Sequence, residues 1–402
     1  MEIKEEADIA VIGGGPSGIA AAVSAARAGC RTILMEKAPF LGGIVSKGGI
    51  TTLCGLYRSS DAALLHEGFP REFARLIMQR DGGAGPLLMG AAAVLLCRPE
   101  SFARAAMDLC KAESTLELHL NTRLTGVRTA GRKISAVHCL RGGRESEIKT
   151  RAVIDCTGDS RVCRAAGTPL LQPDASNQVP AVIFPLENIS GLPLSAVSAA
   201  RWHMAIARAV SRGELPQAAA YINFMPSLEP GTLSVKLNLG RAFQNETEDG
   251  GGAPEDRADR LKQQLIRFFR EAVPGFAHCT SPAEKRPILR RDSARGMGAY
   301  VLGEPDVLAA RKFEDAAARG CWPVEKWDAD GNFSVQYPPV GDFYEIPKRC
   351  LRSIDIDNLF LAGKSISADP GTIASARVVG ICLATGEAAA TMALRRVKEN
   401  GR

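Results

Sequence analysis

A glycine-rich turn between an apolar strand and a helix is the feature that most restricts the fold of this chain. Residues 9–12 (IAVI) are a short β-branched run typical of buried parallel strands, and Gly13, Gly15 and Gly18 follow at once. Residues 19–28 are almost all Ala, Ile or Val, which predicts a buried helix. The order strand, glycine turn, helix predicts the first unit of a doubly wound α/β fold.

The same pattern predicts a dinucleotide site. A helix N-terminus offers free N–H groups and partial positive charge to a pyrophosphate, and the glycines let it approach. A second strand, residues 32–35, ends on Glu36, 18 residues beyond Gly18, where a carboxylate can accept hydrogen bonds from ribose hydroxyls. Because an acid repels a 2′-phosphate, we expect FAD or NAD; a purely structural turn is the alternative. The predicted cofactor contacts are Gly13, Gly15, Pro16, Ser17, Gly18, Glu36 and Lys37.

Paired glycines just past the acid favour FAD. Gly42 and Gly43 let the backbone lie against a long cofactor, an extension that NAD does not need, although a plain loop is the alternative. Together with the first turn and Glu36, this pair resembles the opening of FAD-dependent oxidoreductases of the glutathione-reductase-type superfamily. The resemblance implies FAD lying extended through a Rossmann domain, with its flavin ring at the border of a second domain.

Two later segments carry the same resemblance. Residues 151–154 are typical of a strand, and the turn that follows at 156–159 (CTGD) is similar to the superfamily's A-T-G-D motif. Residues 358–362 are typical of a second strand, which ends in Gly363 before a helix expected over 371–394. The resemblance implies that both segments contact FAD and that the helix N-terminus faces the flavin. The implied contacts are Thr157, Gly158, Asp159, Gly363, Lys364, Ile373 and Ala374.

Residues 291–302, 344–351 and 358–377 together are similar to one branch of the superfamily, the FAD-dependent oxidoreductases related to fumarate reductase and succinate dehydrogenase flavoproteins. Many members carry two histidines near the flavin where this chain has Pro370 and Ile373. Proton donation by those histidines is therefore not expected. Because no His–Thr pair follows Gly43, we also expect non-covalent rather than covalent FAD.

The expected fold class is α/β, with a Rossmann-type FAD-binding domain (parallel sheet plus β-meander) and an inserted α+β substrate domain. We expect a discontinuous FAD-binding domain of residues 1–57, 97–166 and 346–402, an insertion at 58–96, and a substrate or cap domain at 167–345. Strands at 116–120, 124–127, 133–140 and 145–154 predict the meander. Further strands are expected at 178–184 and 232–239, helices at 73–79, 99–112, 197–212 and 261–272, and loops at 81–90 and 245–257.

Composition excludes several other classes. A net charge of +6 spread along 402 residues gives little support to nucleic-acid binding. The first eight residues are acidic, and the most apolar long stretch, 373–394, contains Arg377 and Glu387, so we expect no secretory signal, no membrane span and a cytoplasmic protein. The eleven cysteines form no C-x-x-C pair, so no metal site is predicted.

Two arginines and one cysteine are the candidates for chemistry. Four arginines lie within residues 286–295, and of these Arg291 and Arg295 are the predicted clamp for a carboxylate over the flavin, because a guanidinium binds carboxylate bidentately. A solvated basic loop is the alternative. Cys54 is a thiol in the loop expected near the flavin, with simple packing as the alternative to a covalent or redox role.

These observations predict an FAD-dependent oxidoreductase that transfers hydride between flavin N5 and a small, anionic molecule. Its electron donor or acceptor is not indicated, and a homo-oligomer is possible. One alternative is an electron-transfer or structural flavoprotein subunit without its own small-molecule catalysis. Another is an NAD-binding protein without flavin, which Gly42, Gly43 and the T-G-D turn disfavour.

Overall fold

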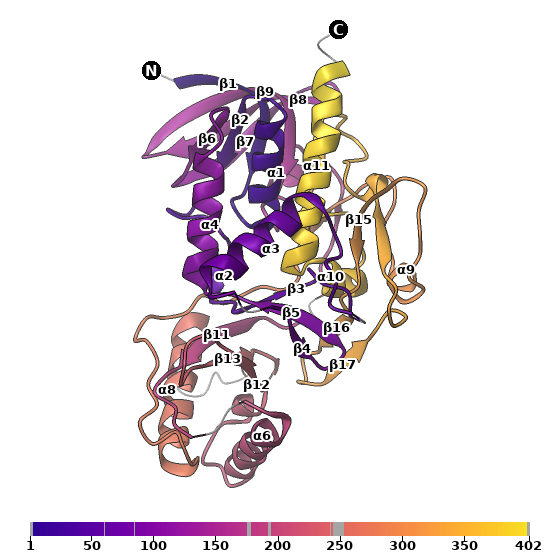
Figure 1. Cartoon of the computed structure of the whole chain (residues 1–402). Helices are drawn as coiled ribbons and strands as arrows, with labels where there is room; N and C mark the ends of the chain where they lie inside the picture. The colour runs from indigo at the N-terminus through magenta and orange to yellow at the C-terminus, as the bar shows by residue number, and fades with distance from the viewer. Residues whose placement is uncertain are drawn as a thin grey trace.

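The computed structural model describes residues 3–59, 61–83, 85–174, 178–191, 194–241, 243 and 253–399. Its main sheet has the strand order β6-β2-β1-β9-β8-β7, with β19 also paired to β9 (Figure 1). The parallel strands are β1 (Ile3–Ile12), β2 (Thr32–Met35), β6 (Leu116–His119), β9 (Arg144–Asp155) and β19 (Leu359–Leu361). The predicted Rossmann-type parallel sheet is confirmed.

The predicted β-meander is confirmed as well. β7 (Thr122–Ala130), β8 (Lys133–Arg141) and the first half of β9 pair antiparallel, while the second half of β9 lies between β1 and β19. Because side chains alternate along a strand, β1 sends Ile9 and Val11 to one apolar cluster and Ala10 and Ile12 to another. The meander and the last part of the sheet share the second cluster, through residues such as Val137.

Four helices cover the face of the sheet to which Ile9 and Val11 of β1 point (Figure 1). They are α1 (Pro16–Arg27), α3 (Gly68–Arg80), α4 (Pro99–Lys111) and α11 (Val379–Glu399). Their apolar residues form one core with Ile9 and Val11 of the central strand. The predicted 58–96 segment therefore contributes α3 to the core of the nucleotide-binding layer.

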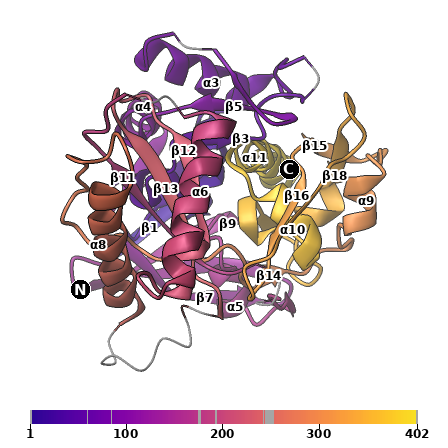
Figure 2. The same ribbon diagram turned by 90° about the horizontal axis from the view of Figure 1, so that it is seen from below.

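A second layer has its own core. β11 (Ala181–Leu186), β13 (Leu233–Asn238) and β12 (Ile222–Pro226) form an antiparallel sheet in that order, and α6 (Ala196–Ser211) and α8 (Pro254–Ala272) cover one face (Figure 2). Val235 and Leu237 of β13 pack with the aromatic side chains of this core. Alternation therefore leaves Lys236 on the opposite face of the sheet.

A third group of elements lies beside this layer (Figure 1). It contains α9 (Glu304–Leu308), β15 (Ala316–Gly320), β16 (Val324–Trp327), β17 (Phe333–Gln336) and β18 (Tyr344–Pro347). These elements share a core with α10 (Pro370–Ala376) rather than with the second layer. The segment 167–345, predicted as one cap, thus contributes to two separate apolar cores.

The single C-terminal helix predicted over 371–394 is wrong. The structure has α10 and α11, which meet at an angle of 96° around Arg377. α11 packs along α1, whereas α10 packs on β16 and α9. The Ala-rich composition concealed the break, because only Arg377 and Gly380 near it depart from an apolar helical pattern, and neither by itself ends a helix.

Two predicted loops also differ. β4 (Leu87–Met89) lies inside the loop expected at 81–90, where it pairs with β5 (Ala92–Leu96). The loop expected at 245–257 falls partly outside the described residues, and its end is helical because α8 already begins at Pro254. The remaining elements are α2 (Ile44–Gly48), β3 (Thr52–Cys54), α5 (Arg161–Ala165), β10 (Leu170–Leu171), η1 (Gln217–Ala220), β14 (Arg295–Gly296), η2 (Lys348–Cys350) and η3 (Gly363–Ser365).

Within the described part of the chain, no single helix has both the length and the apolar composition needed to cross a membrane. α10 and α11 meet these two criteria only when taken as a pair.

Asn358 connects the meander to the main sheet. Its Oδ1 accepts from the Ile134 amide (2.8 Å), and its Nδ2 donates to the carbonyls of Ile134 (2.8 Å) and Arg151 (2.9 Å). We expect Asn358→Leu to lower the stability by about 2–5 kcal/mol, because buried backbone groups lose their partners. Urea unfolding measures this loss. Arg132→Ala is the control, since Arg132 joins the same segments from the surface and should cost less than about 1 kcal/mol. Equal losses would contradict the expectation.

Candidate active site

The first glycine turn shows which glycines serve packing and which leaves room for a ligand. A Cβ at Gly13, whose φ is +108°, would lie 2.4 Å from the Cys156 carbonyl oxygen, and one at Gly18 would lie 1.7 Å from the Gly13 carbonyl oxygen. A Cβ at Gly15 would meet no atom within 4 Å. Gly15 is the N-cap of α1, with Pro16 at its first turn, so open space lies at the helix end that attracts phosphate.

Glu36 is held by backbone amides in the position expected for a ribose-binding acid. The Gly14 N–H donates to Oε2 (2.7 Å), and the Ala38 N–H donates to Oε1 (2.8 Å). Each carboxylate oxygen keeps a second lone pair for a further donor. The acid lines a pocket with Ile12, Gly13, Met35, Lys37, Thr122, Arg123, Leu124, Thr157 and Arg161. Sequence reasoning missed the residues from β7 and α5, because no local pattern marks them.

Gly42 and Gly43 lie directly against the first turn. The Gly42 N–H donates to the Gly14 carbonyl (2.9 Å), and a Cβ at Gly43, whose φ is +52°, would lie 2.9 Å from Cα of Gly15. The close approach of two backbones explains why both positions are glycine. The second glycine pair thus continues the surface that begins at Gly15.

The T-G-D turn and the C-terminal glycine close the other side. The Gly158 N–H donates to Ser365 Oγ (3.1 Å), and a Cβ at Gly363 would lie 2.6 Å from Ser17 Oγ. Asp159 pairs with Arg161 (2.9 Å) at the surface. Three segments that are far apart in the sequence therefore meet around the N-terminus of α1.

These contacts fit an extended dinucleotide such as FAD. The open helix end can hold a pyrophosphate, the amide-bound acid can hold a ribose, and the glycine backbones leave space along the path between them. Ile373 and Ala374 lie elsewhere, fully buried in the core shared by α10 and the third group of elements. Their contact with the cofactor stays a prediction.

Lys364 faces the T-G-D turn. Its Nζ donates to the Arg290 carbonyl (2.9 Å), and its Cε would be 3.6 Å from a Cβ at Gly158. Burial, with a smaller contribution from Arg377, lowers the pKa of Lys364 to about 8. Contact of Lys364 with the flavin or its ribityl chain stays a prediction.

Three cations meet at Trp327, near the end of β16. Nζ of Lys236 lies 5.1 Å from the centroid of one Trp327 ring, and Cζ of Arg291 lies 5.8 Å from it. Arg377 donates to Oε1 of Gln178 (3.0 Å), a residue that forms a bridge pair with Trp327. We call Lys236, Arg291 and Arg377 the cation cluster.

The cation cluster is short of partners. Arg291 is 6% exposed and donates from Nη2 to Oδ1 of Asn238. Among the described residues, neither Nη1 of Arg291 nor Nε of Arg377 has a hydrogen-bond partner, although both atoms are buried. Burial lowers the pKa of both arginines, Arg377 further lowers the pKa of Arg291, and both arginines lower the pKa of Lys236. A guanidinium nevertheless keeps its charge at neutral pH.

Arg291 was predicted as part of an anion clamp, whereas Lys236 and Arg377 were given no role. Sequence signals existed for both. Lys236 is the charged residue in a strand that otherwise alternates apolar and small polar residues, and Arg377 interrupts an Ala-rich helical pattern. Neither signal identifies a partner, since strand pairing and the helix break bring the two together only in the fold.

Cys54, at the end of β3, lies next to the cation cluster. Its Sγ contacts the Thr52 carbonyl (3.8 Å), and Lys236 and Arg377 are close enough to act on its charge. Burial nevertheless raises the pKa of the Cys54 thiol to about 12. The neutral thiol is a poor nucleophile, so this geometry favours the packing role over a covalent or redox one.

Arg295 is fully buried, and its donors go to the protein itself. It pairs with Asp292 and donates to the carbonyls of Ala368 (2.8 Å), Ser293 (2.9 Å) and Gln172 (2.8 Å). These bonds connect β14 to the residue that follows β10 and to the segment that precedes α10. Because four donor contacts are already made, the geometry favours a structural role for Arg295 over the predicted clamp.

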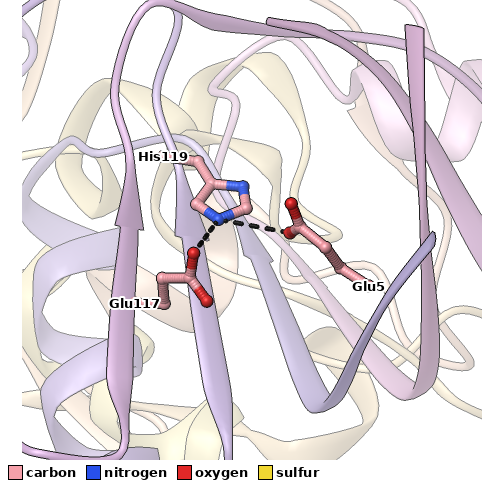
Figure 3. Close-up of side chains that lie close together, drawn as sticks. All are labelled: Glu5, Glu117 and His119. Atoms are coloured by element: carbon pink, nitrogen blue, oxygen red, sulfur yellow. Dashed lines mark hydrogen bonds and ion pairs between the residues drawn. The ribbon is translucent and has the colours of Figure 1, made fainter. Parts of the chain in front are cut away.

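One further polar group lies on the main sheet (Figure 3). Nε2 of His119 is 2.8 Å from Glu117 and 3.3 Å from Glu5, and the ligand atoms of the three residues lie within 4.8 Å of one another. Arg141 also reaches Glu5 (3.9 Å). These contacts account for the group as paired side chains that join β1 to β6.

A cavity of about 650 Å³ lies on another part of the molecule. Its walls come from the start of α3, from β15 and from α11, and include His66, Glu67, Arg319, Lys348, Glu387 and Arg395. Side chains of both signs of charge line it. It contains none of the residues predicted to hold the cofactor.

We expect Gly15→Ala to weaken FAD binding by about tenfold or more while the fold keeps its stability, because the added methyl enters only the open space. Gly18→Ala should instead lower the stability of the apoprotein by about 1–3 kcal/mol through its contact with the Gly13 carbonyl. Flavin absorbance after dialysis and thermal unfolding measure the two effects. Unchanged FAD affinity in Gly15→Ala would contradict the assignment.

We expect Arg295→Met to lower the stability by about 3–5 kcal/mol, because it leaves buried Asp292 unpaired. Arg290→Met is the matched control, since the Arg290 side chain is exposed, and it should change stability by less than about 0.5 kcal/mol. Urea unfolding measures both. A stable, folded Arg295→Met protein that has lost anion binding would restore Arg295 to the clamp.

Two solved structures are similar to this chain, and the first of them, with a TM-score above 0.5, shows the same fold. A geranylgeranyl bacteriochlorophyll reductase-like protein from Thermoplasma acidophilum is 16% identical, with a TM-score of 0.53 over 99% of this chain and 80% of that chain. The p-nitrophenol 4-monooxygenase PnpA from Pseudomonas putida DLL-E4 is 13% identical, with a TM-score of 0.46 over 100% of this chain and 82% of that one. No curated protein matches the sequence.

The family comparison covers almost the whole chain. Residues 8–401 match the family described as FAD dependent oxidoreductase. That span includes the first glycine turn, the T-G-D turn, the cation cluster and both C-terminal helices. The chain therefore belongs to the FAD-dependent oxidoreductase family, and FAD is its cofactor.

Proposed function

We propose that this oxidoreductase acts on a small anionic molecule that binds to the cation cluster. One observation carries the proposal: two buried guanidinium nitrogens, Nη1 of Arg291 and Nε of Arg377, have no hydrogen-bond partner among the described residues. A buried, unpaired donor on a charged group is costly, so such donors indicate a missing acceptor.

The charge balance supports an anion as that acceptor. The charge of the Glu325 carboxylate raises the pKa of all three cations, and Oε2 of Glu325 also accepts from Nε1 of Trp322 (3.1 Å). One carboxylate leaves the three cations in excess. Lys236, Arg377 and Glu325 are only partly buried, so a small ligand can reach them. A planar guanidinium matches the two oxygens of a carboxylate.

The residues of the glycine turns, Glu36 and Gly363 would hold FAD, and we propose that they do so without a covalent bond. When bound, FAD supplies a two-electron acceptor or donor at flavin N5. Arg291 would hold the anionic end of the substrate, while Trp327 and Asn238 fix the guanidinium. Arg377 would place positive charge between the substrate and the start of α11.

Two finer assignments complete the proposal. The chain belongs to the branch related to fumarate reductase and succinate dehydrogenase flavoproteins, an assignment that the similarity of residues 291–302, 344–351 and 358–377 supports. All eleven cysteines are free, which supports a reducing compartment such as the cytoplasm.

We expect Arg291→Met to weaken anion binding about tenfold or more, because it removes the buried guanidinium that has a free donor. The measurement is titration of the visible spectrum of the holoprotein with sulfite and with short carboxylates. Arg290→Met, which changes the neighbouring exposed arginine, should bind as the wild type does.

The outcomes separate the alternatives. If Arg291→Met binds every probe as tightly as the wild type, the cation cluster is not the anion site. If anions bind but no small acid, amine or alcohol reduces the flavin, while a partner protein does, the chain is an electron-transfer subunit. A preparation that takes up no FAD would contradict both.

A further inference from the structure

We infer that Lys236 exchanges a proton with the substrate, and that the substrate is therefore a small anion bearing a hydroxyl or amino group beside the carbon that is oxidised. The inference rests on the proposed function, since it needs an anion held at the cation cluster. It adds the residue that moves the proton and narrows the class of substrate to molecules such as 2-hydroxy or 2-amino carboxylates.

The fold of the second layer places Lys236 at the site. In β13 the side chains of Val235 and Leu237 enter the core beneath α6 and α8, so Lys236 between them points to the opposite face. That face carries Asn238, which binds Arg291 directly. A lysine in this register meets the other two cations and the residues of β3 and β16.

The amine has room to act. Nζ of Lys236 lies 5.1 Å from the centroid of a Trp327 ring. Among the described residues, no carboxylate or carbonyl accepts a hydrogen bond from this nitrogen. This differs from Lys364, whose Nζ is bound to the Arg290 carbonyl. Lys236 is also only partly buried, so its nitrogen can meet a ligand directly.

The surrounding charges favour exchange of a proton near neutral pH. Burial and the two guanidiniums, Arg291 and Arg377, lower the pKa of Lys236 to about 8, while Glu325 and Cys54 act in the opposite direction. The guanidiniums keep their protons, and the Cys54 thiol keeps its own because burial raises its pKa to about 12. Lys236 can therefore lose and regain a proton where its neighbours cannot.

The step balances in both directions. In oxidation, the neutral amine of Lys236 forms an N–H bond with the proton of the substrate O–H or N–H group. The electron pair released forms the C=O or C=N bond, and the hydrogen on carbon leaves with its electron pair, for which oxidised FAD is the acceptor. In reduction, the Lys236 ammonium returns the proton to the oxygen or nitrogen.

Two variants separate the proton from the charge. Lys236→Arg keeps the positive charge but cannot act as a base, so the holoprotein should bind anions within about threefold of the wild type. Its single-turnover rate of flavin reduction, with 2-hydroxy and 2-amino acids as the probes, should fall about a hundredfold or more. Lys236→Ala should lose both binding and rate, and added methylamine should restore part of the rate.

The pH profile is a second readout. In the wild type the rate of flavin reduction should rise with pH through an apparent pKa at or above about 8, because the bound anion favours the ammonium. Anion affinity should fall over the same range, as the amine loses its charge. Neither transition should remain in Lys236→Arg.

Each result has one meaning. Wild-type rate and pH profile in Lys236→Arg, with anion binding intact, would overturn the inference and leave the proposed function standing. If both Arg291→Met and Lys236→Ala bind anions as tightly as the wild type, the proposed function is overturned. Reduction by 2-hydroxy or 2-amino acids that is slow in Lys236→Arg and restored by methylamine in Lys236→Ala would support both.

Discussion

The close approach of three backbone segments around the N-terminus of α1 is the constraint on which the rest of the structure depends. Gly13 lies against the Cys156 carbonyl, and Gly18 lies against Gly13 itself. On α11, a Cβ at Gly386 would lie 2.1 Å from the Ser17 carbonyl oxygen, so the last helix packs against the first at backbone distance. Side chains larger than hydrogen would separate these segments and move the strand ends that carry the site.

That packing also explains why the charged site lies where it does. Because α11 is held against α1, its start is fixed beside Gly55, where a Cβ at Gly380 would lie 2.4 Å from the backbone. The chain reaches this point from α10 through a 96° bend, and Arg377 lies in the bend. The second layer then brings Lys236 and Arg291 to the same place from the other side, so two layers with separate cores share one cluster of positive charge.

Local sequence predicted the nucleotide-binding half of the molecule well. The glycine turn, the acid at the end of β2, the meander and the C-terminal strand are each encoded within a few residues, because turn chemistry and strand alternation are local properties. The 96° break and β4 were missed for the opposite reason. Ala-rich sequence is compatible with one long helix or two, and a three-residue strand at 87–89 exists only because β5 pairs with it.

The candidate site divides in the same way. The residues proposed to hold the cofactor could be named from the sequence because the chemistry of a pyrophosphate and a ribose requires particular residues at particular spacing. Arg291 and Arg295 lie four residues apart and could not be told apart from the sequence. In the fold, Arg295 donates to buried carbonyls and to Asp292, whereas Nη1 of Arg291 has no hydrogen-bond partner among the described residues. The residues that surround Arg291 come from β13, β16 and the bend between α10 and α11. Long-range packing brings them together, and no local sequence pattern predicts it. The sequence by itself thus determined that the chain binds FAD, and the tertiary structure decided which cations remain free to meet a substrate.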